Sequence, residues 1–120
     1  MSLDTTFPTI LIAECNFELR SRLTRAFRQQ GYLVLEAENS TQALDFAKIH
    51  SRHIHVMLAG GSDEGRALAA TIKQYRPRMS VLFINEDRNH QTPGFLPPEL
   101  AVGKVRELVA PPKTTRTAKA

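Results

Sequence analysis

The stretch Ile54-His55-Val56-Met57-Leu58-Ala59-Gly60-Gly61 decides the fold, because it predicts a buried strand that ends in two glycines. A short apolar run bounded by glycine is typical of a central strand in a parallel α/β sheet. In such sheets, ligands and reactive groups lie outside the carboxyl ends of the strands. The stretch therefore leads to the expected functional edge, yet Gly60 supplies no side chain there.

Short β-rich runs alternate with amphipathic helical patterns on both sides of this stretch, as in a parallel sheet with helices on its faces. Asn16 is expected to cap the helix after the first strand, and Gly31 to end it. Asn39 with Gln42 has the form of a capping box for the next helix. The other expected strands cover residues 9–13, 32–37 and 80–85.

The alternation breaks after the strand at residues 80–85. Only 12 residues (86–97) lie before Pro98, which is placed to begin a last helix. That is too short for a crossover helix and a full fifth strand, although residues 94–96 could add a stub of extended chain. The fourth strand would then be an edge strand with an uncovered apolar side. The loop at residues 87–96, a second copy of the chain or a partner protein could cover this side, and self-association is the main hypothesis. The expected interface residues are Val81, Phe83, Phe95 and Leu96.

The net charge of +4 is concentrated in a short tail. The chain has 120 residues, with 16 bases and 12 acids, and residues 113–120 hold three of the bases and no acid. Without them, 13 bases face 12 acids, so the charge does not favour a nucleic-acid partner. We expect an N-terminal extension at 1–8, one domain at 9–110 and a disordered basic tail at 111–120.

Other features of composition narrow the class of protein. No apolar run approaches the length of a bilayer span, and the N-terminus lacks the pattern of a secretory signal. We therefore expect a cytoplasmic protein with no membrane partner. Cys15 is the only cysteine, which excludes an intramolecular disulfide and a thiolate zinc cage.

Several motifs, in their order along the chain, resemble a response-regulator receiver domain over about residues 9–110. They are Ile10-Leu11-Ile12-Ala13-Glu14-Cys15-Asn16, Gln29-Gln30-Gly31-Tyr32, Tyr75-Arg76-Pro77 before Val81-Leu82-Phe83-Ile84, and Thr92-Pro93 before Pro98-Glu99-Leu100. The resemblance implies a flavodoxin-like, doubly wound parallel α/β sheet. Its strand order would be 2-1-3-4, with the fifth strand absent or vestigial.

The chemistry that the resemblance implies is missing at most positions. Receivers carry a pair of acids after the first strand, where this chain has Glu14 and Cys15. The phosphate-accepting aspartate falls on Gly60, the hydroxyl residue after the fourth strand falls on Asn85, and the lysine falls on Thr92. The loop after Gly60 is also about three residues short.

These departures predict a chain that does not accept phosphate by the family's route. Magnesium usually takes one or two carboxylates beside the phosphate, and here only Glu14 remains of three. Nothing replaces the lysine in neutralising the charge of phosphoryl transfer. The predicted function is a non-enzymatic signalling module without a cofactor, acting by binding a protein such as a signalling protein or a histidine kinase.

Two alternatives remain open at this point. The first is an atypical phosphorelay response regulator that uses non-standard residues. The second is a small flavodoxin-like enzyme or ligand binder that uses Glu14, Cys15 and Asn85. A screen with metals, nucleotides and flavins would address the second.

Some clusters suggest other ligands. Glu14 and Asp63, with Glu86 and Asp87, are candidates for a substitute metal site, although acids at a helix start also complement its positive end. The Gly60-Gly61-Ser62 turn could form an anion nest, but the acids that follow would repel a phosphate. Finally, His50, His53 and His55 lie close in sequence, but without a fourth ligand they do not favour zinc.

Overall fold

The computed structural model describes residues 7–84 and 95–109. Short strands alternate with helices over most of this length. In chain order the elements are β1 Thr9–Ala13, α1 Phe17–Gln29, β2 Leu33–Ala37, α2 Ser40–Ile49, β3 Val56–Gly60, α3 Asp63–Tyr75, β4 Ser80–Ile84, β5 Phe95–Leu96, a 3₁₀ turn Pro98–Leu100 and α4 Ala101–Leu108.

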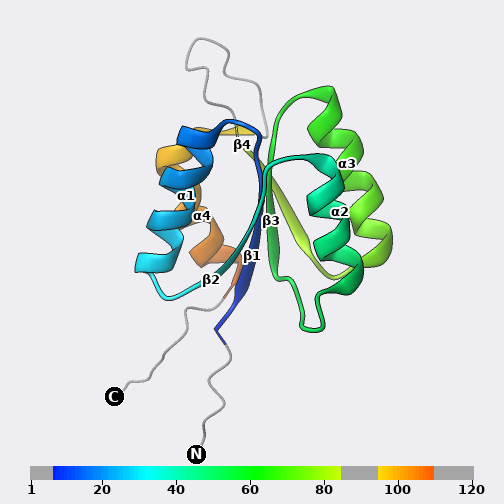
Figure 1. Cartoon of the computed structure of the whole chain (residues 1–120). Coiled ribbons are helices and arrows are strands. Elements are labelled where there is room, and N and C mark those ends of the chain that lie inside the picture. Colours follow the sequence, from blue (N-terminus) through cyan, green and yellow to red (C-terminus); the bar gives the residue numbers. More distant parts are fainter. Residues whose placement is uncertain (1–6, 85–94, 110–120) are drawn as a thin grey trace, which may run out of the picture.

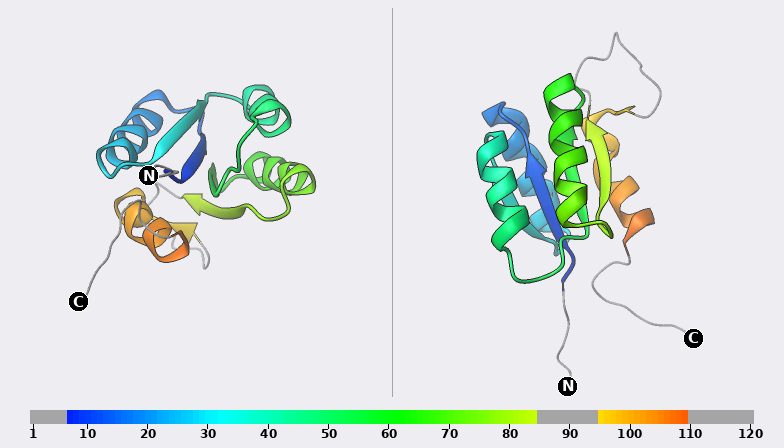
Figure 2. Two further views of the ribbon diagram at one scale, coloured as in Figure 1. Left: turned by 90° about the horizontal axis from the view of Figure 1, so that it is seen from below. Right: turned by 90° about the vertical axis from the view of Figure 1, so that its right-hand side faces the viewer.

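The strands form one parallel sheet in the order β2-β1-β3-β4-β5. Helices α1 and α4 cover one face of the sheet, and α2 and α3 cover the other (Figures 1 and 2). This is the predicted doubly wound, flavodoxin-like α/β fold. The 2-1-3-4 order is confirmed, with a vestigial fifth strand.

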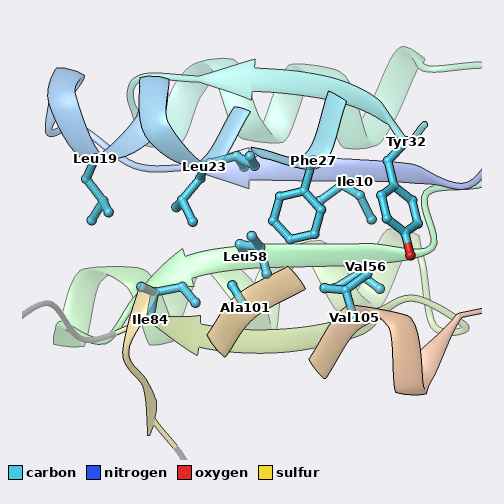
Figure 3. Packing of buried hydrophobic residues seen from close by; sticks show 11 residues of the cluster. Ile10, Leu19, Leu23, Phe27, Tyr32, Val56, Leu58, Ile84, Ala101 and Val105 are labelled. Atoms are coloured by element: carbon cyan, nitrogen blue, oxygen red, sulfur yellow. The ribbon is translucent and has the colours of Figure 1, made fainter. Parts of the chain in front are cut away.

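Two apolar cores lie on the two faces of the sheet. In the first, α1 and α4 pack on the sheet through Leu19, Leu23, Phe27 and Val105, and the Phe27 ring meets Tyr32 at 5.7 Å between centroids (Figure 3). In the second, Leu11 and other strand residues meet the small residues of α2 and α3. Every residue of β1 is buried, as expected for a central parallel strand.

Side-chain caps fix where the helices begin. Asn16 Oδ1 accepts from the Leu19 N–H at 3.0 Å, and Asn39 Oδ1 accepts from the Gln42 N–H at 2.9 Å, as the sequence predicted. The capping box is incomplete, because the Gln42 side chain accepts from the N–H of Glu38 and not of Asn39. Gly31, with φ of 93°, follows α1.

Some predicted boundaries shift. Strand β3 begins at Val56 and β2 at Leu33, and the last helix begins as a 3₁₀ turn at Pro98. Strand β4 is not the outermost strand, because Phe83 and Ile84 pair with β5. The basic tail, residues 1–6 of the predicted N-terminal extension and the predicted end of the domain at residue 110 lie outside the described residues. Among the helices described, none is both long and apolar enough to cross a membrane.

Candidate functional site

A small pocket opens at the carboxyl edge of the sheet, where the predicted site lies. Its volume is about 120 Å³, and it sits between the ends of β1 and β3 and the starts of α2 and α3. The lining residues are Ala13, Glu14, Cys15, Glu38, Asn39, Ser40, Gly60, Ser62, Glu64, Gly65 and Leu68. The structure thus brings Glu14, Cys15 and Gly60 together.

Glu14 is held at the end of β1 by the turn into α1. Its Oε2 accepts from the Asn16 N–H at 2.9 Å, and the exposed Cys15 Sγ lies 3.9 Å from the same oxygen. Across the edge, a Cβ added to Gly60 would lie 3.5 Å from Glu14 Oε1. A side chain at residue 60 would therefore stand directly beside the Glu14 carboxylate.

The connection from β3 to α3 is very short. Only Gly61 and Ser62 separate the two elements, and the Ser62 Oγ caps α3 by accepting from the Gly65 N–H at 3.1 Å. A Cβ added to Gly65 would lie 2.0 Å from the carbonyl oxygen of Gly60. The first turn of α3 is therefore packed against the end of β3, and only glycine fits at residue 65.

The pocket rim is acidic. Glu38 and Glu64 join Glu14 there, and the Ser40 Oγ donates to Glu64 Oε2 at 3.2 Å, which links the starts of α2 and α3. The sequence prediction missed Glu38 and Ser40 as site residues. The sequence could have indicated both residues, because Glu38 and Ser40 directly follow β2. In the predicted strand order, the carboxyl end of β2 lies beside that of β1.

The two metal candidates that the structure describes, Glu14 and Asp63, do not form a metal site. Among residues 7–84 and 95–109, no group of three histidine, cysteine or acidic side chains is placed to hold a metal ion. Asp63 is exposed in the first turn of α3, and it is not a lining residue of the pocket. Glu86 and Asp87 lie outside the described residues, so their part in such a site stays a prediction.

The histidines lie at the opposite, amino end of the sheet. The rings of His53 and His55 meet edge to face at 4.4 Å, and His55 Nδ1 accepts from the Thr9 N–H at 3.1 Å. Burial, followed by the charges of Arg76 and Arg52, lowers the pKa of His50. Ring packing and a main-chain hydrogen bond fit a structural role for these side chains, rather than a zinc site.

Of the predicted interface residues, Val81 and Phe83 are partly buried against the second core, and Leu96 against the first. The main chain of Phe95 pairs with Phe83. Asn85 and Thr92 lie outside the described residues, so the predicted roles of these two positions remain untested.

Sequence comparison gives no relative. No family model matches the chain, and no curated protein matches it.

Solved receiver domains match its structure. The receiver domain from hybrid histidine kinase CckA is 26% identical, with a TM-score of 0.70 over 83% of this chain and 97% of that one. Chemotaxis protein CheY4 from Vibrio cholerae is 14% identical, with a TM-score of 0.73 over 87% of this chain and 100% of that one.

A receiver domain protein from Methanospirillum hungatei JF-1 gives a TM-score of 0.70 at 17% identity, over 85% of this chain and 93% of that one. The strand order and the pocket at the carboxyl edge of the sheet show that the chain has a doubly wound fold of the flavodoxin type. Within that class, the described residues form a receiver-like domain.

Proposed function

We propose that this chain is a non-catalytic, receiver-like module of two-component signalling that acts by binding proteins, without phosphorylation at the end of β3. One observation carries the proposal. Strand β3 ends in Gly60, which has no side chain, and the first turn of α3 is packed against its carbonyl oxygen at Gly65. By the resemblance, this is the position of the phosphate acceptor.

The chemistry around Gly60 supports the same conclusion. Phosphoryl transfer needs cations that neutralise the developing charge. None of the described residues that line the pocket is lysine or arginine, and three of them are glutamates. Glu14 is the only acid there that follows β1, and it already accepts a main-chain hydrogen bond. The glutamates would repel a phosphate group, and in the part of the chain that the structure describes no three acidic, histidine or cysteine side chains are placed together to hold a metal ion.

The partner is proposed to be a signalling protein, such as a histidine kinase, in the cytoplasm. The solved structure of CckA supports this class of partner, because its receiver domain comes from a hybrid histidine kinase. The side of the sheet at β4 and β5 is the proposed protein-binding surface. Its residues are Val81, Phe83, Phe95 and Leu96.

Magnesium and beryllofluoride, an analogue of a bound phosphoryl group, test the proposal by NMR titration of the amide signals. We expect no saturable shift at Glu14, Cys15 or Gly60. The matched control is the double variant C15D/G60D, which places two further carboxylates beside Glu14, where a Cβ at residue 60 has room. We expect this variant to bind magnesium. Saturable shifts in the wild-type protein would instead favour the atypical phosphorelay regulator.

A further inference from the structure

The outer edge of β2 carries main-chain groups that no described residue satisfies. The Leu33 N–H donates to Pro8, and the Ala37 carbonyl accepts from Glu14, so these residues face β1. Because main-chain groups alternate in direction along a parallel strand, those of Val34 and Glu36 point away from the sheet. Strand β2 is the last strand of the described sheet on this side (Figure 2).

Two surface grooves follow this edge. One, of about 440 Å³, is lined by α1 residues including Arg25 and by Glu36 of β2. The other, of about 590 Å³, begins at Phe7 and runs past Leu33 and Leu35. Arg28 lines both grooves. Within residues 7–84 and 95–109, no other strand therefore covers this edge.

The edge strand also exposes apolar side chains. Leu33, the first residue of β2, is 45% exposed, and Phe7, which lines the same groove, is 42% exposed. Natural edge strands are usually blunted by charged side chains, above all lysine, or by proline or a bulge. Strand β2 has the sequence Leu-Val-Leu-Glu-Ala, with neither lysine nor proline, and its one charged side chain, Glu36, is paired with Arg20 and Arg28 of α1.

We propose that a second copy of this chain adds its own β2 to this edge in antiparallel orientation. A two-fold axis at Leu35 pairs Val34 of each copy with Glu36 of the other. This register forms four N–H···O bonds and uses every outward main-chain group of these two residues in both strands. A centre at Glu36 would instead place two carboxylates opposite each other.

The side chains fit the same register. On the face towards α2, Leu35 meets Leu35 of the second copy, and the exposed Leu33 is covered beside Ala37. On the face towards α1, Glu36 already lies 3.8 Å from the Arg28 guanidinium of its own copy. The register brings Glu36 next to the exposed Arg25 of the second copy, for which no described residue supplies an acidic partner. The register therefore pairs apolar side chains on one face of the strand, and on the other face it pairs Glu36 with a basic residue of α1.

Sedimentation over a range of concentrations tests the association at low salt. We expect the mass to rise from 13.4 kDa towards twice that value in the wild-type protein. The variant R25E should remain monomeric, because it places a glutamate beside Glu36 of the second copy. The control R78E changes the net charge equally, at an exposed residue on the turn before β4, and should dimerise like the wild type.

Disulfide trapping in a C15S background tests the register. In L35C/C15S, the two residues 35 would face each other with Cα atoms about 4.5 Å apart, within disulfide range. In L33C/C15S, the two residues 33 would be offset by four positions, about 13 Å. Oxidation should therefore link the first variant and not the second. A wild-type monomer at all concentrations would overturn the proposal, as would equal linking of both variants.

Discussion

At the scale of single residues, the pocket is defined by a pair of glycines. Gly60 leaves the end of β3 without a side chain, and Gly65 lets the first turn of α3 approach its carbonyl oxygen. The short connection through Gly61 and Ser62 depends on this approach. The two glycines therefore act separately: residue 60 has room for a side chain beside Glu14, whereas the position of α3 requires glycine at residue 65.

The variant G65A tests this packing. A Cβ at residue 65 would meet the backbone oxygen of Gly60 at 2.0 Å, which cannot be relieved by a side-chain rotation. We expect a loss of about 1–3 kcal/mol in the free energy of unfolding, measured with urea. The control G103A lies on an exposed part of α4 with no atom within 4 Å and should gain up to about 1 kcal/mol. Equal stability of G65A and wild type would contradict the account.

Arg76 gives a second prediction at this scale. Its guanidinium donates to the carbonyls of Ala47 at 2.9 Å and Arg52 at 2.7 Å, and also to that of His50. It thereby fixes the connection between α2 and β3. The variant R76K keeps the charge but cannot make all three bonds, so we expect a loss of about 2 kcal/mol in urea unfolding. In R78K, at an exposed site, the change should stay within about 0.5 kcal/mol. A similar loss of unfolding free energy in R76K and R78K would contradict the role given to the three hydrogen bonds of Arg76.

At the scale of elements, the carboxyl and amino ends of the sheet differ in chemistry. Glutamates gather where α2 and α3 begin, and histidines with arginines gather where β3 starts. Burial lowers the pKa of His50, His53 and His55, and neighbouring positive charges add to the effect. In addition, Nδ1 of His55 must stay unprotonated to accept from the Thr9 N–H.

This arrangement predicts a pH dependence of stability. Below a pH of about 6.5, the unfolded histidines bind protons that the folded ones resist, so the free energy of unfolding should fall as pH drops through that range. Urea unfolding at about pH 7.5 and about pH 5.5 measures how steeply the free energy of unfolding depends on pH. The variant H55N retains an oxygen acceptor for Thr9 but does not titrate, so its slope should be smaller. A slope unchanged in H55N would contradict the assignment to this residue.

At the scale of the whole molecule, much of the fold could be predicted because local signals agree with it. The continuous apolar run of β1 and the caps at Asn16 and Asn39 place the first half of the chain. The close approach of Gly65 to Gly60 and the bonds of Arg76 could not be predicted, since they depend on how separate segments meet in space. The sequence predicted the two-residue β5 only as a stub of extended chain. Its pairing with β4 depends on contacts between separate segments, which the local sequence does not reveal.

The central claim is that the receiver-like fold is retained here without its phosphorylation chemistry. The most direct measurement is the intact mass after incubation with magnesium and acetyl phosphate. We predict an unchanged mass, because β3 ends in Gly60 and the described pocket residues offer no cation to a phosphoryl group. A stable gain of about 80 Da that alkaline treatment removes would reveal an acyl phosphate on another carboxylate and would contradict the account.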